Sequence, residues 1–158
     1  MSPSLDIRRG GPRDLVALAS LLRGAGLPTA DLNGITDLHV WLVEAKDALV
    51  GAIALERFGR EALLRSLAVA PEYRKLGVGQ RLVARLEEDA RGEGVEQLFL
   101  LTETARDFFL RLRYAVVDRS SASDALRQSA EFRSLCPVSA VCMSKSLSGL
   151  PEWNSARG

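Results

Sequence analysis

The junction between an apolar strand and an amphipathic helix in the middle of the chain constrains the fold more than any other feature. Residues 62–69 form a strand-like apolar run, and 76–91 carries apolar side chains on one face and charged ones elsewhere, as a helix does. The loop between them begins at Pro71, which stops the strand ladder, and runs to Gly79. Because the first amides of a helix have no backbone partner, the start of this helix predicts an anion site.

The composition of this loop supports that prediction. Gly77 and Gly79 have no side chains, so the backbone can approach a ligand closely, and Arg74 and Lys75 add two positive charges. A diphosphate would fit this arrangement. The pattern Arg-x-x-Gly-x-Gly is weak by itself, and a plain strand–helix turn that uses glycine for shape is the alternative. The strand before the loop and the helix after it favour the ligand site.

Apolar periodicity along the rest of the chain alternates between the strand and the helix type. Three strand-like runs are joined by the short turns Lys46-Asp47 and Gly59-Arg60, which allow only antiparallel neighbours. The strand 97–101 follows the long helix and can therefore lie parallel to the third strand of this set. The predicted strands are 5–9, 39–45, 48–58, 62–69, 97–101, 115–118 and 138–143, and the predicted helices are 12–22, 76–91, 106–112 and 124–135.

This order predicts an α/β fold with a mixed, mostly antiparallel sheet and helices on both faces. The length of 158 residues suits one domain, predicted over 1–147, followed by a loose C-terminal tail over 148–158. The polar residues of Gly24–Asp37 predict a loop that folds over a substrate.

Charge and hydropathy argue against several classes of partner. The formal net charge is +1, from 21 basic and 20 acidic residues, whereas proteins that bind duplex nucleic acid usually show a clear basic excess. No apolar run approaches the roughly 20 residues that span a bilayer, and the N-terminus lacks the apolar stretch of a secretory signal. We therefore expect a cytoplasmic protein with no nucleic-acid or membrane partner. Cys136 and Cys142 suggest no disulfide framework.

The run from Leu67 to Gly79 resembles the signature of the GNAT superfamily of N-acetyltransferases, and the element order from Asp6 to Leu147 is similar to that fold. The resemblance implies acetyl-CoA as co-substrate. It also implies a sheet splayed in the middle, where a bulged strand at 63–69 diverges from the strand at 97–101 and pantetheine lies in the gap. The residues that it assigns to acetyl-CoA are Leu67, Ala68, Val69, Arg74, Lys75, Leu76, Gly77, Val78, Gly79 and Phe109.

A narrower resemblance rests on residues 100–105, Phe108-Phe109, Glu131-Phe132 and 135–137. These residues are similar to the arsenic-resistance N-acetyltransferases, and to short amino-acid N-acetyltransferases of the N-acetylglutamate-synthase type. Both groups imply a small amino-acid-like acceptor with a primary amine. The resemblance leaves a homodimer open.

Acetyl transfer to an amine requires a base for the amine proton, a donor for the tetrahedral oxyanion and a thiolate that leaves. A backbone amide near Val69 is the predicted oxyanion donor. Glu56, late in an apolar strand, is the first candidate base, because such surroundings raise the pKa of a carboxyl. Glu103, just beyond the strand at 97–101, is the second. The alternatives are a solvated strand end for Glu56 and a loop residue or helix cap for Glu103.

Arg65 interrupts an apolar central strand, and a buried guanidinium needs a partner. It is a candidate to bind a carboxylate or an arsonate-like anion of the substrate, or to form a structural pair with an acid such as Glu56 or Glu44. Ser66 and Thr102 are candidates for hydrogen bonds to the acceptor or the pantetheine, and both also suit local backbone contacts.

One departure from the family pattern concerns the general acid. Many relatives have a tyrosine near the leaving sulfur, where the register of this chain puts Phe109, and Arg113 stands where glycine is common. Phe109 has no hydroxyl, so the thiolate is expected to leave without a dedicated acid, as the moderate pKa of a thiol allows. Tyr114 would replace the acid only if its side chain turned inward, and packing is the favoured role.

No metal is predicted, since His39 is the only histidine and no zinc spacing is present. Cys136 and Cys142 are predicted to pack as small hydrophobes, with a soft ion such as trivalent arsenic as the alternative. Because no cysteine lies near the loop, the amine is expected to attack directly in a ternary complex. Two other functions stay open. A protein N-terminal or lysine acetyltransferase would show an open acidic groove, and a non-catalytic CoA-binding module would expose Glu56 and Arg65.

Overall fold

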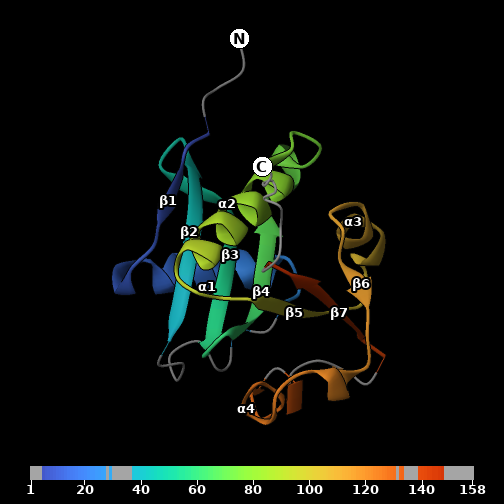
Figure 1. Ribbon diagram of the computed structural model, residues 1–158. Helices are drawn as coiled ribbons and strands as arrows, with labels where there is room; N and C mark the ends of the chain where they lie inside the picture. Colours follow the sequence, from blue (N-terminus) through green and yellow to red (C-terminus); the bar gives the residue numbers. More distant parts are fainter. Residues whose placement is uncertain (1–4, 28, 30–36, 131, 134–138, 148–158) are drawn as a thin grey trace, which may run out of the picture. The chain divides into compact units, whose positions relative to one another are not determined.

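The computed structural model describes residues 5–27, 29, 37–130, 132–133 and 139–147. Within these residues, seven strands form a sheet in the order β1-β2-β3-β4-β5-β7-β6 (Figure 1). Strands β4 and β5 pair in parallel, whereas β1–β2, β2–β3, β5–β7 and β6–β7 pair antiparallel. The expectation of a mixed, mostly antiparallel sheet with helices is therefore confirmed.

Contacts divide the chain into two compact units, residues 1–56 with 64–86, and residues 57–63 with 87–158. Strand β4 and helix α2 each contribute to both. The first elements in chain order are β1 (Ile7–Arg9), α1 (Leu15–Gly24), β2 (Leu38–Ala45), β3 (Ala48–Phe58), β4 (Glu61–Val69) and α2 (Val78–Gly92). They are followed by β5 (Gln97–Thr102), α3 (Arg106–Arg111), β6 (Ala115–Val116), α4 (Asp124–Arg127) and β7 (Val141–Ser146).

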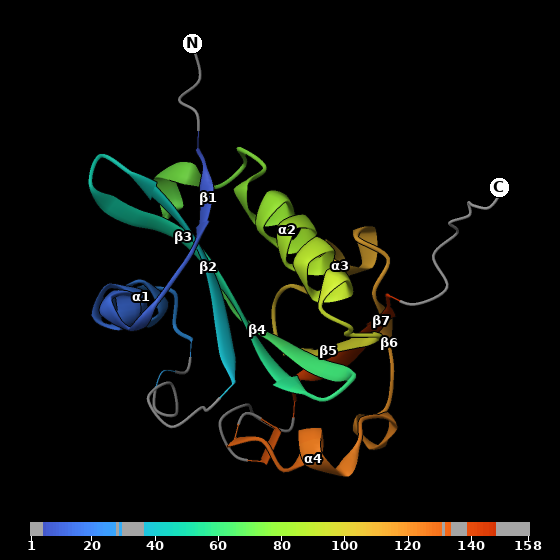
Figure 2. The same cartoon turned by 60° about the vertical axis from the view of Figure 1, so that its left-hand side comes forward.

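In the first unit, α1 and α2 cover opposite faces of β2 and β3 (Figure 2). On the α1 face, Leu18 and Leu22 pack against alternate small and branched residues of the strands, which are Val40, Leu42, Ala52, Ala54 and Ala68. On the α2 face, a Cβ at Gly51 would lie 3.0 Å from Cγ1 of Val78. Glycine at this position therefore lets the first turn of α2 approach β3 closely.

In the second unit, α3 and α4 lie on opposite sides of β5 and β7 (Figure 2). The core on the α4 side consists of Leu63, Phe99, Ala122, Leu126, Phe132 and Cys142. Ser123 caps α4, because its hydroxyl accepts a hydrogen bond from the Leu126 amide at 3.3 Å. The Ser123 amide in turn donates to Oε1 of Glu61 at 2.8 Å, which fastens α4 to the first residue of β4.

A buried polar network lies on the other side of the second unit. The Tyr114 hydroxyl donates to Oε2 of Glu87 at 2.7 Å, and Nζ of Lys145 donates to both carboxylate oxygens and to the Leu112 carbonyl at 3.0 Å. Burial, followed by the charge of Glu87, raises the pKa of Tyr114 well above its usual value, so the phenol stays protonated. Tyr114 is 2% exposed, as the predicted packing role requires.

Several predicted boundaries were wrong for local reasons. The helix predicted from residue 12 begins as a 3-10 turn at Pro12–Asp14, before α1 starts at Leu15. The helix predicted over 124–135 is interrupted, because α4 ends at Arg127 and a turn follows it; Ala130 and residues 132–133 are helical again, and residues 131 and 134–135 lie outside the described part of the chain. The last strand starts at Val141, after the non-strand residues 139–140, and its predicted first residue, 138, lies outside the described residues; β6 is only Ala115–Val116. The predicted tail 148–158 lies outside the described residues.

The buried ion pair generates a stability prediction. Lys145→Met keeps the length and apolar stem of the side chain but leaves the Glu87 carboxylate, with its side chain 12% exposed, without this cation. We expect a loss of about 3 kcal/mol in the free energy of unfolding, measured by urea denaturation. The matched change at the exposed helix residue Arg106, Arg106→Met, should cost less than about 0.5 kcal/mol. Equal losses for the two variants would contradict a specific role for the pair.

Candidate functional site

A left-handed residue interrupts strand β4. Ser66 has φ of 61°, a conformation that costs a non-glycine residue roughly 1–2 kcal/mol and that occurs in one type of β-bulge. The residues of β4 that pair with β5 are Glu61, Ala62 and Leu63, which all precede this position. The irregular backbone at Ser66 agrees with the bulged strand that the family resemblance implies.

The same position carries a buried charge pair. The side chain of Arg65 is fully buried, and its Nη1 lies 3.5 Å from Oε1 of Glu56, whose side chain is 13% exposed. Nε of Arg65 donates to the Ser66 hydroxyl at 3.3 Å. A guanidinium at this distance favours the ionised form of the carboxylate. Of the alternatives left open by the sequence, the pair between Arg65 and Glu56 forms, and neither residue is exposed.

The loop after β4 is shaped by backbone geometry and by one side chain. A 3-10 turn, Pro71–Tyr73, leads to Lys75 and Gly77, which have φ of 69° and 78°. Nε of Arg74 donates to the Val69 carbonyl at 3.0 Å, so this arginine ties the loop back to the strand. Arg74 was expected as a cation beside the ligand, and this hydrogen bond gives it a structural role as well.

Helix α2 begins at Val78, two residues after the predicted start at Leu76, because the left-handed residues 75 and 77 cannot continue a helix. The Gly77 carbonyl accepts the first helical hydrogen bond, from the Arg81 amide at 3.1 Å. The amides of Val78 and Gly79 are therefore among the first of the helix, which have no partner within it. A Cβ added at Gly77 would meet no atom within 4 Å, so open space lies beside this turn. Amides, dipole and space together fit a diphosphate.

The predicted site residues Thr102, Glu103 and Phe109 lie in the second unit and make local contacts. The Thr102 hydroxyl accepts a hydrogen bond from the Ala105 amide at 2.9 Å, as the structural alternative for this residue requires. The Ser139 hydroxyl donates to Oε2 of Glu103 at 3.1 Å, in an exposed position. Phe109 is 4% exposed and makes an edge-to-face contact with Tyr114, with ring centroids 5.3 Å apart.

Other sequence candidates also have a place in the structure. His39 lies 2.7 Å from Asp37 and 2.9 Å from a guanidinium nitrogen of Arg9. Burial raises the pKa of the Cys142 thiol to about 11, in keeping with a packing role. Cys136 and most of the predicted substrate loop lie outside the described residues. Where the structure describes the chain, no cluster of three or more His, Cys, Asp or Glu is arranged to hold a metal, and no helix is long and apolar enough to cross a membrane.

Two features of the site were missed by sequence reasoning. The family resemblance implied a bulge in this strand, but nothing in the local sequence assigned the left-handed conformation to Ser66. The hydrogen bond from Arg74 to Val69 spans five residues of the loop, and only the path of the loop brings the two groups together.

Comparison with known families identifies the fold and the loop. The model of the acetyltransferase (GNAT) domain matches residues 36–116, which include β2 to β6 and the whole β4–α2 junction. This match covers half of the chain, and the chain belongs to the GNAT acetyltransferase domain family.

Relatives agree with this assignment. An uncharacterized N-acetyltransferase of Chlorobaculum tepidum is 32% identical over 80 residues, 50% of this chain and 51% of the relative. An amino-acid acetyltransferase of Aeromonas salmonicida is 34% identical over 70 residues, 43% of this chain and 16% of the relative. The solved N-acetylglutamate synthase of Neisseria gonorrhoeae, in complex with coenzyme A and N-acetyl-glutamate, has a TM-score of 0.75 at 22% identity, over 93% of this chain and 36% of that one. The matched regions thus span about half or less of these proteins.

The backbone at Ser66 generates a test with two matched variants. Ser66→Gly and Ser66→Val both remove the hydroxyl that accepts from Arg65, but only glycine adopts a φ of 61° without strain. We expect the glycine variant to be more stable than the valine variant by about 1–2 kcal/mol in chemical denaturation. If valine is tolerated as well as glycine, the left-handed conformation of this residue is wrong.

Proposed function

We propose that this chain transfers an acetyl group from acetyl-CoA to the primary amine of a small amino-acid-like molecule. One observation carries the proposal. Within a single compact unit, β4 passes from an irregular residue at Ser66, beside a buried acid–base pair, to a glycine-shaped loop and the start of a long helix. Membership in the GNAT family supports the same function.

The acyl donor is proposed to bind along β4 and its loop. The pyrophosphate would accept hydrogen bonds from the backbone between Arg74 and Gly79, where the helix dipole and the open space at Gly77 favour an anion. The backbone from Leu67 to Val69 would pair with the pantetheine. Bound there, acetyl-CoA supplies the thioester, and the oxyanion would be held by an amide near Val69.

The proposed reaction needs two proton transfers. The acceptor enters as an ammonium ion and loses one proton to a base, for which Glu56 is the first candidate and Glu103 the second. The amine nitrogen then bonds to the acetyl carbon, the carbon–sulfur bond breaks, and the second nitrogen proton leaves with the sulfur. Arg65 lies 3.5 Å from Glu56, and a neighbouring positive charge favours the ionised carboxylate, which is the form that can accept a proton, but also makes that carboxylate a weaker base.

The acceptor is proposed to carry an acid group as well as an amine. The candidate groups for this acid are Arg65, Ser66 and Thr102, because a guanidinium and hydroxyl groups complement a carboxylate. Arg65 pairs with Glu56 in this structure, so a substrate carboxylate would compete with Glu56 for the guanidinium. The Aeromonas salmonicida relative, named an amino-acid acetyltransferase, supports this class. Arsenical amino acids are a subset of this class, and a screen of amino acids as acceptors would include them. Neither Glu56 nor Arg65 is exposed, so the exposure that would favour a non-catalytic CoA-binding module is not seen at these two residues.

Binding of the acyl donor is the first test. Isothermal titration of the purified chain with acetyl-CoA should give a micromolar Kd, about −8 kcal/mol. Arg74→Glu with Gly77→Asp places two acidic side chains at the proposed pyrophosphate site and should abolish the heat of binding. Glu72→Gln, an exposed change in the same loop, should leave the Kd unaltered. Lack of binding by the unaltered chain would overturn the proposed function.

The role of Glu56 is tested by kinetics with the best amine from an amino-acid screen. Glu56→Gln keeps the shape of the side chain but cannot accept the proton, so kcat should fall about 10²–10⁴-fold, while the KM for acetyl-CoA changes little. Glu44→Gln, an acid on the adjacent strand β2 that pairs with Arg8, serves as the matched control. If Glu103→Gln alone reduces kcat, the second candidate is the base.

A further inference from the structure

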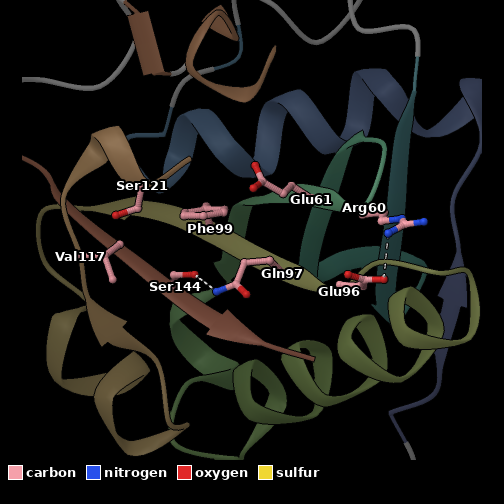
Figure 3. A pocket seen from close by; sticks show the side chains of 8 residues that line it. All are labelled: Arg60, Glu61, Glu96, Gln97, Phe99, Val117, Ser121 and Ser144. Carbon is pink, nitrogen blue, oxygen red and sulfur yellow. Dashed lines mark hydrogen bonds and ion pairs between the residues drawn. The ribbon is translucent and has the colours of Figure 1, made fainter. Parts of the chain in front are cut away.

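The second unit contains a pocket that shares no residue with those assigned to acetyl transfer. Its volume is about 390 Å³, and its floor is formed by the first residues of β4 and β5 and by β7 (Figure 3). All of its lining residues belong to the second unit. Small-molecule sites in proteins usually enclose about 300–1,000 Å³, so this volume suits a metabolite-sized ligand.

The pattern of the strands explains why the pocket is there. Along one face of β4, β5 and β7, the apolar residues Leu63, Phe99 and Cys142 lie in the core beside α4. Two positions along each strand, on the same face, stand Glu61, Gln97 and Ser144, which line the pocket. Glu61, Gln97 and Ser144 therefore lie on the same face of the sheet as the apolar core residues and extend that face into the pocket.

The polar side chains on the floor are held in place. Nε2 of Gln97 donates to the Ser144 hydroxyl at 2.5 Å, and Ser144 is 7% exposed (Figure 3). Oε1 of Glu61 accepts the Ser123 amide at 2.8 Å, which leaves its other oxygen for a second donor. Groups that are fixed before a ligand arrives lose little conformational entropy on binding.

The charges in the pocket favour a cation. Arg60, whose side chain is 82% exposed, lies 3.9 Å from Glu96 at one end of the pocket, so these two charges largely offset each other. Glu61 lines the middle, and among the described residues it has the Ser123 amide but no cation as a partner. The pocket thus holds one carboxylate in excess. At the other end, Val117 and Phe99 supply apolar surface.

We propose that this pocket binds a small organic ammonium compound, separately from the acetyl-transfer site. The ammonium group donates to Glu61, a neighbouring hydroxyl or amide contacts Gln97 and Ser144, and the apolar part of the ligand lies against Phe99 and Val117. The observation behind the assignment is the meeting of one uncompensated carboxylate, two fixed polar side chains and an apolar wall in one cavity of suitable size.

Three probes of one size test the charge preference. Benzylamine, benzyl alcohol and benzoate share a phenyl ring and a one-carbon arm and differ in carrying a positive, no or a negative charge. Each is titrated into the isotopically labelled chain without acetyl-CoA, and amide shifts are followed by NMR. We expect benzylamine to bind most tightly and benzoate not to bind, with the largest shifts at Gln97, Phe99, Ser123 and Ser144. Shifts that map elsewhere, or tighter binding of benzoate, would overturn the proposal.

Two variants and a control tie the binding to the pocket. Glu61→Gln retains an oxygen for the Ser123 amide and should weaken benzylamine about tenfold, as expected for loss of a hydrogen bond to a charged group. Ser121→Trp, at an exposed lining residue, should block the pocket and abolish binding without disturbing the core. Glu88→Gln makes the same charge change on the exposed face of α2 and should leave the Kd unaltered. An equal loss in Glu61→Gln and Glu88→Gln would show that only net charge matters, which contradicts a specific site.

Discussion

The buried guanidinium of Arg65 determines which groups must surround it at the centre of the first unit. Arg65 lies in a strand whose other residues are mainly apolar, and its side chain is fully buried. Removing such a charge from water is costly unless it is paired, so both Glu56 and the Ser66 hydroxyl must lie within reach. The left-handed backbone at Ser66 is part of the same arrangement. Backbone strain of this kind, at Ser66 and next to the buried charge of Arg65, is typical of functional positions in proteins.

In the second unit a buried charge is also paired, but here the partners form a closed network. Glu87, Lys145 and Tyr114 form a closed network in which the carboxylate and the ammonium each have more than one partner. Nζ of Lys145 also donates a hydrogen bond to the Leu112 carbonyl. The residue after Leu112 is Arg113, which has φ of 75°. The network therefore fixes the turn that follows α3, and with it the ring of Phe109 against Tyr114. The polar groups of this network already have partners within it, so the network is better suited to stabilising the fold than to catalysis.

The pocket at Glu61 differs from both of these clusters in its balance of charge. In the Arg65–Glu56 pair and in the Lys145–Glu87 pair, each carboxylate has a cation close by. Glu61 is held by a backbone amide, which satisfies part of the carboxylate but leaves its charge. The proposed ammonium ligand would supply the positive charge that Glu61 does not receive from the described residues. Strand β4 thus contributes Ser66 and Arg65 to the proposed acetyl-transfer site and Glu61 to the pocket.

The sequence by itself determined the order of the elements and the loop. Apolar period and turn residues are local properties, so the three antiparallel strands, the parallel strand after α2 and the glycine-shaped junction could all be predicted. The exact ends could not, because the left-handed Lys75 delays α2, and the turn after Arg127 ends α4, in ways that neighbouring residues do not reveal. Only the tertiary structure decided which acid pairs with Arg65, since Glu56 and Glu44 were equally available in sequence. It alone placed Glu61, Gln97 and Ser144 together, because each lies on a different strand and the contact depends on sheet register.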